Sequence, residues 1–518
     1  MVYTQKHPAL LIMGIIMLSL GVLVDFALMD DVVNYLHIQK FGGEIVSLSY
    51  LFGGIAVVVG LWHLFAEHKK GHLDYYLSTV AGATFILFIA MMVRWFIAPL
   101  VAVWSKSLGP VMGAKYLHEV LGLNYIVLGI LIGIIVVNFF KVPVWAENGV
   151  RLSRLGLKTG VVLLGTLYSL AELQQLGSLS ILMVGFFVLG SVGLVLWMAS
   201  RRNLPNSMGG VLSAGMGVCG VSATVASAPV VQAKSVEIAY TIGTILLWGV
   251  GCMFLFPIVG NLLDLGYVQF GAWAGTGILN SAQVAGAALA YQPDGIETLK
   301  VAEIFNITRV LVLPIIVVWL AVWYVKREEN APDVNVAKVA FQKFPIFVLG
   351  FLLMFALSST GMFAPANHYK GKYFDNNIAA EKLLTAEAVT ILKTEMDKVK
   401  VPAQQEALKR LINNKKVMSI ADDNNLRGLV NSNKLSKNAN HFLKKAHKSV
   451  RHTSKKIKKF RQFITWLFAF GLVGLGMQIT FASIKQAGGQ PLVIGGIVGT
   501  LKAVLSLIVV LLFVQNTI

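Results

Sequence analysis

Two glycine-rich segments carry the residues best suited to binding chemistry. They span residues 207–234 (SMGGVLSAGMGVCGVSATVASAPVVQAK) and 271–291 (GAWAGTGILNSAQVAGAALAY). Each glycine lowers helix stability by about 0.5–1 kcal/mol relative to alanine, so both segments are predicted to be broken helices. Unwound backbone leaves N–H groups free, and the N-terminus of a half-helix carries partial positive charge, so such a break can bind an anion. The predicted substrate-binding residues are Gly217, Gly220, Ser222, Thr224, Gly277, Asn280, Ser281 and Gln283.

The same small residues have a purely structural alternative, because they let helices pack closely. Three basic residues inside apolar stretches, Arg94, Arg309 and Lys502, are candidate anion-binding or gating charges. A charge at membrane depth costs about 2.5–3.5 kcal/mol on insertion scales and is a functional hypothesis by default. The alternative is again structural: an arginine could bond helix-end carbonyls or a buried acid such as Glu303, and Lys502 could make an interhelical contact.

No enzyme site stands out among the remaining polar residues. The sequence has no phosphate-binding loop, no paired Cys/His metal spacing and no nucleophile elbow, and Cys219 and Cys252 both lie inside apolar runs. The protein is therefore predicted not to be an enzyme, to use no cofactor or metal, and not to bind nucleic acid.

The elements that must position these residues are transmembrane helices. The chain is 56% hydrophobic and 13% charged, far from the balance of a soluble domain. Apolar stretches of about 20 residues can cross a bilayer as helices, since lipid leaves no partner for unpaired backbone groups. We predict an all-α polytopic membrane protein with about 13 spans. They lie near residues 8–28, 43–65, 76–104, 121–140, 157–175, 179–199, 207–232, 238–260, 266–292, 301–324, 340–360, 462–482 and 490–515.

Short basic loops predict the orientation. Lys69 and Lys70, the 141–158 loop, and the pairs after spans 179–199 and 301–324 all fall on one side if every span crosses once. That side is predicted to be cytoplasmic and to hold the N-terminus, in a bacterial inner membrane.

The predicted domains are extra N-terminal helices (1–75), a first core part (76–363), a soluble helical insertion (364–461) and C-terminal core helices (462–518). The insertion holds 22 Lys and Arg against 8 Asp and Glu, and so carries most of the net charge of +19. A solvated helical hairpin is the simplest interpretation, with turns and short helices over 421–442; partner or lipid-headgroup binding is the alternative.

The chain also repeats itself. Four glycines (160, 165, 177 and 185) recur 311 residues later (471, 476, 488 and 496), and Gln175 recurs as Gln486. Weaker echoes link RWFIAP (94–99) with RVLVLP (309–314) and VLG at 127–129 with VLG at 348–350. An odd number of spans separates the 311-residue copies, which predicts inverted repeats, a mark of secondary transporters.

These segments resemble the YeiH-like family of bacterial membrane proteins, whose members bear a sulfate-exporter label. The stretches that carry the resemblance are SAGMGVCGVSATVASAPVVQAK (213–234), RLGLKTGVVLLGTLYSL, NSAQVAGAALA, ITRVLVLPIIVV and GLGMQITFASIKQAGGQPLVIG, within residues 85–360 and 462–515. The resemblance implies inverted repeats and broken helices. Many members carry a His-Glu pair where this chain has Leu279 and Asn280, and a Glu where it has Ala228. Their absence argues against proton coupling and against the family's usual substrate.

Together these observations predict a secondary transporter of a small anion, sulfate-like or another oxyanion or organic anion, working by alternating access. Its partners would be the anion, the lipid bilayer and a coupling ion, Na⁺ or H⁺; a homo-oligomer stays open. The alternatives are a cation-coupled or cation:proton exchanger on the same scaffold, which needs a midplane acid, or a membrane sensor that uses the insertion.

Overall fold

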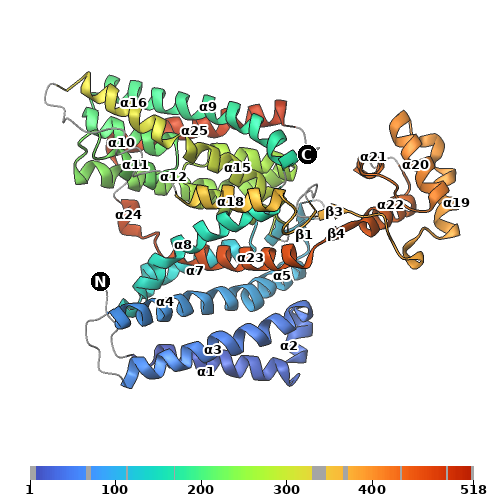
Figure 1. The fold of residues 1–518 in the computed structure, drawn as a ribbon. Helices are drawn as coiled ribbons and strands as arrows, with labels where there is room; N and C mark the ends of the chain where they lie inside the picture. The colour runs from blue at the N-terminus through green and yellow to red at the C-terminus, as the bar shows by residue number, and fades with distance from the viewer. Residues whose placement is uncertain are drawn as a thin grey trace. The chain divides into compact units, whose positions relative to one another are not determined.

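The computed structural model describes residues 7–65, 72–112, 115–168, 170–293, 295–328, 346–365, 372–431, 435–485 and 488–514 (Figure 1). Lys69, Lys70, Gln486 and the start of the predicted 340–360 span lie outside these residues, and the side chains of residues 169–179, Gln175 among them, are also outside the description. Two compact units emerge. The first comprises Met1–Leu164, Gln174–Leu352 and Phe463–Ile518, and the second comprises Gly165–Leu173 and Leu353–Gln462.

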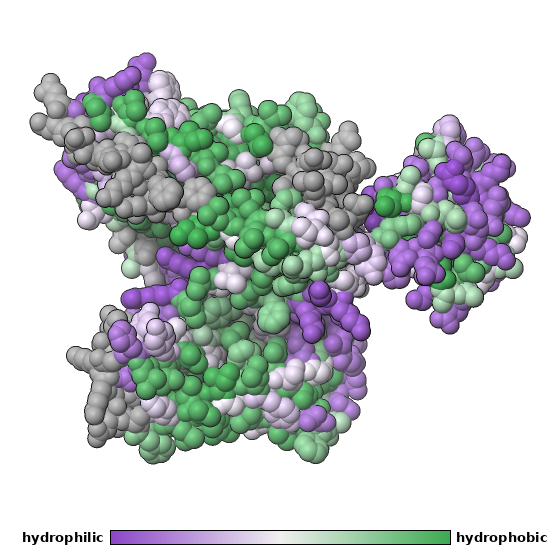
Figure 2. All heavy atoms as spheres, viewed as in Figure 1, coloured by the Kyte–Doolittle hydropathy of each residue, from purple (hydrophilic) through white to green (hydrophobic). Residues whose placement is uncertain are grey.

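The first unit is built from apolar helices. In the described residues six are long and apolar enough to cross a membrane: Gln39–Phe65, His72–Ser107, Ser180–Arg201, Ser235–Leu262, Glu297–Val325 and Gly489–Phe513. Shorter apolar helices are Ala9–Asp25, Tyr125–Phe140 and Ile346–Ser359. Apolar side chains also dominate the visible surface of these helices (Figure 2). An all-α multi-pass membrane protein is therefore confirmed, whereas the predicted count of 13 spans is not.

The helices of the chain follow one another in this order. Before the first break they are α1 (Ala9–Asp25), α2 (Asp30–Tyr35), α3 (Gly42–Phe65), α4 (His72–Met92), α5 (Ala98–Ser107), α6 (Leu117–Val120), α7 (Tyr125–Ile135), α8 (Glu147–Leu164) and α9 (Leu170–Arg201). The later ones include α12 (Ser235–Leu262), α15 (Glu297–Leu311), α16 (Leu313–Val325), α18 (Ile346–Ser359), α23 (Lys455–Gly476), α24 (Phe481–Lys485) and α25 (Gly489–Phe513). A short hairpin, β1 (Pro110–Met112) with β2 (Lys115–Tyr116), follows α5.

Both glycine-rich segments are divided into two helices. The first forms α10 (Asn206–Gly217) and α11 (Val221–Ser227), and the second forms α13 (Tyr267–Gly277) and α14 (Ser281–Tyr291). Gly220, with φ of +80°, occupies the left-handed region at the first break, where a residue with a side chain would be strained. The second break passes through extended backbone at Ile278 and Asn280.

Glycines set the contacts between α8 and α23. A Cβ at Gly160 would lie 3.0 Å from Cε2 of Phe468, and a Cβ at Gly471 would lie 2.5 Å from Cγ of Leu157. Residue numbers rise along α8 as they fall along the facing α23, so the two helices are antiparallel. Their backbones can approach because glycine has no side chain.

The second unit has its own hydrophobic core. Its elements are β3 (Lys372–Phe374), α19 (Ala386–Thr394), α20 (Pro402–Asn414), α21 (Ile420–Asn431), α22 (Lys437–Val450) and β4 (Arg451–Thr453), and β3 pairs antiparallel with β4. Leu392, Leu411, Leu426 and Leu443 are buried together. Two full helices thus replace most of the turns predicted over 421–442, because apolar residues recur there at helical spacing. Most of its visible surface is hydrophilic (Figure 2).

Candidate functional site

The two helix breaks meet. A Cβ at Gly220 would lie 3.1 Å from Cα and 3.2 Å from Cβ of Asn280. The absence of a side chain at Gly220 therefore lets the α10–α11 break lie directly against the residue that opens α14. Two stretches of irregular backbone, 60 residues apart in the sequence, share one buried location.

In each segment, a buried basic side chain donates hydrogen bonds to backbone carbonyls at the C-terminal end of the first half-helix. Lys502 Nζ donates to the carbonyl oxygens of Met216 (3.3 Å) and Gly217 (3.2 Å) at the end of α10. Arg309 donates through NH1 to the carbonyl oxygen of Ile278, 2.5 Å away, just after α13. Both side chains are buried. The C-terminus of a helix has backbone carbonyls without hydrogen-bond partners and carries partial negative charge. Lys502 and Arg309 donate to these carbonyls and are attracted by this partial charge.

Polar atoms without partners gather where α14 begins. Asn280 caps α14 by accepting from the backbone N–H of Ala282. Among the described residues, nothing hydrogen-bonds to Ser281 Oγ, to Thr276 Oγ1 or to either polar atom of the Gln283 amide, and Gln283 is fully buried. Leaving a buried polar group unpaired costs about 1–3 kcal/mol, so such atoms call for a bound water or ligand.

Helix α12 supplies the wall opposite Gln283. Gly249 of α12 abuts this amide so closely that a Cβ there would overlap Gln283 Oε1. Thr244 and Thr241, about one and two turns earlier on α12, also have hydroxyls that find no partner within the described chain. Neither threonine nor Gly249 stands out in the sequence, because each is an ordinary small residue in an apolar helix.

The remaining predicted residues of the break region differ in accessibility. Thr224 is buried, and its hydroxyl donates to the carbonyl of Gly220 at 3.2 Å. Gly277 ends α13, where a Cβ would lie 3.1 Å from Ser506 Oγ. Ser222 is exposed on α11, so its side chain does not point into the buried contact between the breaks.

Arg94 lies in a different environment from Arg309 and Lys502. Its Nε is 3.5 Å from Glu44 Oε1, and its guanidinium lies over the rings of Tyr125 (4.6 Å), Phe41 (5.1 Å) and Trp466 (5.5 Å). This is the structural alternative for an intramembrane arginine: an acid and aromatic faces surround the charge. The structure does not bring Arg94 together with the predicted break residues.

The sequence did not predict one buried polar cluster, which links Glu303 and Arg309 through Asn306. Lys300, Glu303, Asn306 and Arg309 recur every three residues along α15, and each is at most 4% exposed. Asn306 bridges the two charges beside it: its Nδ2 donates to Glu303 Oε2 (3.0 Å) and its Oδ1 accepts from Arg309 NH2 (3.0 Å). The i, i+3 spacing was visible in the sequence, but the bridging by Asn306 was not.

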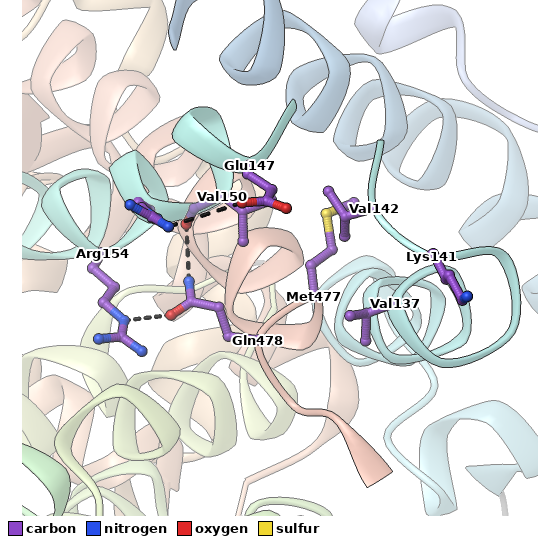
Figure 3. A pocket seen from close by; sticks show the side chains of 9 residues that line it. Val137, Lys141, Val142, Glu147, Val150, Arg154, Met477 and Gln478 are labelled. Atoms are coloured by element: carbon purple, nitrogen blue, oxygen red, sulfur yellow. Dashed lines mark hydrogen bonds and ion pairs between the residues drawn. The ribbon is translucent and has the colours of Figure 1, made fainter. Parts of the chain in front are cut away.

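A separate basic pocket is lined by the segment that follows α7 (137–142), by α8 and by the two residues that follow α23 (Figure 3). It has a volume of about 680 Å³, and its lining residues are Val137, Lys141, Val142, Glu147, Val150, Arg151, Arg154, Met477 and Gln478. The charged residues among them are three basic ones, Lys141, Arg151 and Arg154, and one acid, Glu147. Gln478 holds this wall in place: it accepts from Arg154 Nε, donates to the carbonyl of Val150 at 2.9 Å, and donates to Ser153 Oγ at 3.1 Å. This pocket includes none of the break residues.

Comparisons with known proteins give a consistent result. Residues 93–401 match the model of a family described as conserved hypothetical protein 698. A UPF0324 membrane protein of Nitratidesulfovibrio vulgaris is 34% identical over 454 residues, which is 86% of this chain and 98% of the relative. A second one from this bacterium is 36% identical over 280 residues, covering 53% of this chain and 77% of the relative. UPF0324 membrane protein FN0533 of Fusobacterium nucleatum is 30% identical over 231 residues, which cover 44% of this chain and 66% of the relative. No solved structure matches the chain.

These matches extend beyond the segments that carry the resemblance in the sequence. The 454-residue match is longer than residues 85–360 and 462–515 together, and the family match runs to residue 401. At least part of the N-terminal helices or of the insertion is therefore shared with relatives.

Proposed function

This chain belongs to the UPF0324 family of membrane proteins, the YeiH-like family, and from that premise we propose that it is a secondary transporter of a small anion. The observation that carries the proposal is the contact between the two helix breaks, with a buried cation at the C-terminal end of each first half-helix. Irregular backbone at membrane depth is tolerated only where it is buried in protein or lines a cavity. In transporters, discontinuous helices of this kind hold the substrate.

The charges of the region favour an anion. Arg309 and Lys502 are close enough for their charges to interact, and Glu303 offsets only one of them. The beginning of α14 adds partial positive charge and the unpaired Ser281 and Gln283 side chains. An oxyanion would accept hydrogen bonds from these donors, whereas a cation would lie beside the two basic side chains of Arg309 and Lys502.

Symmetric contacts support the proposed inverted repeats. The Gly160–Phe468 contact maps onto the Leu157–Gly471 contact when 311 is added to one residue and subtracted from the other. Two antiparallel membrane helices exchanged in this way are related by a two-fold axis in the membrane plane, as inverted repeats require.

A second pair of contacts extends the symmetry to two more helices. A Cβ at Gly129 of α7 would lie 2.9 Å from Val473, and one at Gly350 of α18 would lie 3.1 Å from Val162. Val162 and Val473 are 311 residues apart, and Gly129 and Gly350 end the two VLG sequences. We therefore propose that α7–α8–α9 and α18–α23–α25 are inverted copies that rock about the breaks to give alternating access. We place the N-terminus in the cytoplasm of a bacterial cell, on the side of the short basic loops.

Thermal stabilisation of the detergent-purified protein tests the proposal. The panel is sulfate, sulfite, thiosulfate, bicarbonate and short carboxylates, with sodium as the cation control. A ligand at 100 times its dissociation constant should stabilise the protein by about 2.7 kcal/mol. We expect a saturable shift with one class of anion that is lost in Asn280→Ala and Gln283→Ala. Ser222→Ala decides whether the exposed face of α11 takes part. A shift with sodium and with no anion would overturn the proposal in favour of the cation-coupled exchanger.

A further inference from the structure

A buried carboxylate is joined to a helix break by an unbroken chain of hydrogen bonds. The chain runs from Glu303 through the Asn306 amide to the guanidinium of Arg309, and from there to the carbonyl oxygen of Ile278 at the α13–α14 break. Glu303 is only 1% exposed, and in this chain of bonds the Asn306 amide lies between its carboxylate and the Arg309 guanidinium. A change of charge on Glu303 would therefore act on Arg309, and through it on the break.

Few other charges surround Glu303. The helices packed on α15, namely α13, α14 and α16, carry no Asp, Glu, Lys, Arg or His. On α15 itself, Lys300 lies one turn before Glu303 and is 2% exposed, and Arg309 lies two turns after it. From neighbouring elements, Lys502 of α25 and the Cys219 thiol of the first break interact with Arg309. Glu303 is thus the acid on which the charge balance of the break region depends.

We infer that Glu303 is the proton-coupling group of this transporter and binds one proton together with each anion. The inference rests on the proposed anion-transport function and names its coupling ion. The proton forms an O–H bond on the Glu303 carboxylate, and no bond in the anion changes. Asn306 Nδ2 can still donate to the other carboxyl oxygen, so the hydrogen-bonded chain survives protonation.

The electrostatic consequence gives coupling in both directions. Protonation of Glu303 removes its negative charge and so raises the net charge of the region that holds Lys300, Arg309 and Lys502 by one unit. The uncompensated charge on Arg309 then attracts an anion, most strongly a divalent oxyanion, at the break. By linkage, a bound anion raises the affinity of Glu303 for its proton by the same factor. Cotransport of proton and anion follows without any acid at Leu279, Asn280 or Ala228.

The test measures sulfate binding to the full-length protein between pH 5.5 and 8.5 by thermal shift, together with proton uptake in weakly buffered solution. For the wild type we expect the dissociation constant to rise by up to tenfold per pH unit above the Glu303 transition, with up to one proton taken up per sulfate. Glu303→Gln mimics the protonated acid and should bind sulfate with an affinity independent of pH and without proton uptake. Glu303→Asp keeps a titratable group and should restore a pH dependence.

Two further variants keep the test decisive. Glu237 is a buried acid of α12 that accepts from Ser207 Oγ and from the backbone N–H of Lys234, both of which glutamine can also satisfy. Glu237→Gln should therefore behave as the wild type. Asn306→Ala breaks the relay while keeping both charges, and should weaken the pH dependence without abolishing binding.

The outcomes separate the two hypotheses. If the wild type binds sulfate but Glu303→Gln keeps the wild-type pH dependence and proton uptake, the inference is overturned and anion transport stands. If neither sulfate nor any other anion of the panel stabilises the wild type, the proposed function itself fails, and the inference fails with it.

Discussion

The protein buries charged side chains in two ways, and the two differ in whether their polar atoms all have hydrogen-bond partners. In the insertion, Asp423 is fully buried and both carboxylate oxygens are occupied: His447 Nδ1 lies 2.6 Å from Oδ1, and Arg451 NH2 lies 2.6 Å from Oδ2. In the membrane unit, Arg309 and Lys502 bond instead to backbone carbonyls, and Glu303 bonds to an amide. The first arrangement is complete without a ligand, and the second leaves buried polar atoms nearby without partners.

Complete pairing is what a structural ion cluster needs, because a buried charge is tolerated only when its partners satisfy it. Incomplete pairing beside irregular backbone is costly for stability alone, so it persists where a ligand or a conformational change uses it. The comparison therefore supports a role in folding of the insertion for the Asp423 cluster, and a role in the proposed transport for the Arg309 region. Substitutions in the two places should affect different properties.

The largest effect is expected from Arg309→Met. This change leaves the Ile278 carbonyl and Asn306 Oδ1 without their buried donor, at a cost of about 1–3 kcal/mol each in the free energy of unfolding. Anion uptake into proteoliposomes should fall to background. Arg309→Lys, which keeps the charge but not the two-pronged contact, should fold better and retain part of the uptake. Wild-type uptake by Arg309→Met would remove Arg309 from the mechanism.

A comparable loss of stability without a loss of transport is expected from Asp423→Asn. The neutral amide leaves Arg451 buried without its carboxylate, so the insertion should lose about 3–5 kcal/mol of local stability. Hydrogen exchange of the α21 and α22 amides would show this loss, while anion uptake stays near the wild-type rate. The exposed Asp397→Asn is the matched control in the insertion. Loss of uptake in Asp423→Asn alone would contradict the assignment of this cluster to folding.

Lowering the pH should remove the difference in local stability between Asp423→Asn and the wild type. Burial raises the pKa of Asp423, but its contacts with His447 and Arg451 outweigh burial and hold the pKa below the ordinary value of 3.8. A depressed carboxyl pKa contributes stability above the unfolded value, and this contribution is lost as the pH falls through the folded value. The exchange protection of wild type and variant should therefore differ at pH 5 and converge well below pH 3.8. A constant difference would show that Asp423 stays ionised throughout.

The helix breaks could be predicted from the sequence because their cause is local. The glycines of 207–234 and 271–291 weaken the helix wherever these segments lie, and the structure interrupts both at Gly217 and Gly277. The contact of Gly220 with Asn280 could not be predicted, because it depends on how α10 and α13 pack in three dimensions.

The buried charges show the same limit. The sequence indicated that Arg309 and Lys502 lie inside apolar stretches, and named helix-end carbonyls among the partners for an arginine. It could not tell that Arg94 would find Glu44 and three aromatic rings instead, since those partners come from distant positions along the chain. In the insertion, the helices of 421–442 were underestimated because Asn, Asp and Ser hide the apolar spacing of Leu426 and Leu429.

The smallest effect is expected in the basic pocket, where the charges are neither fully buried nor fully paired. Arg154→Gln lowers the number of cations lining the pocket from three to two and leaves the breaks untouched. Because exposed charges mainly steer the approach of a ligand, the initial rate of anion uptake should fall a few-fold at low ionic strength. The difference should vanish near 1 M of a chloride salt, where the Debye length is about 3 Å.

Arg201→Gln is the matched control for the pocket, because Arg201 is an exposed cation at the end of α9 that does not line it. If this variant slows uptake as much as Arg154→Gln does, the effect belongs to the overall charge of that side of the protein rather than to the pocket. If only Arg154→Gln slows uptake, and does so with the expected salt dependence, the pocket lies on the route by which the anion approaches the breaks. The pocket would then be a third kind of charged region, distinct from the Asp423 cluster and the Arg309 region, because it attracts the anion without binding it.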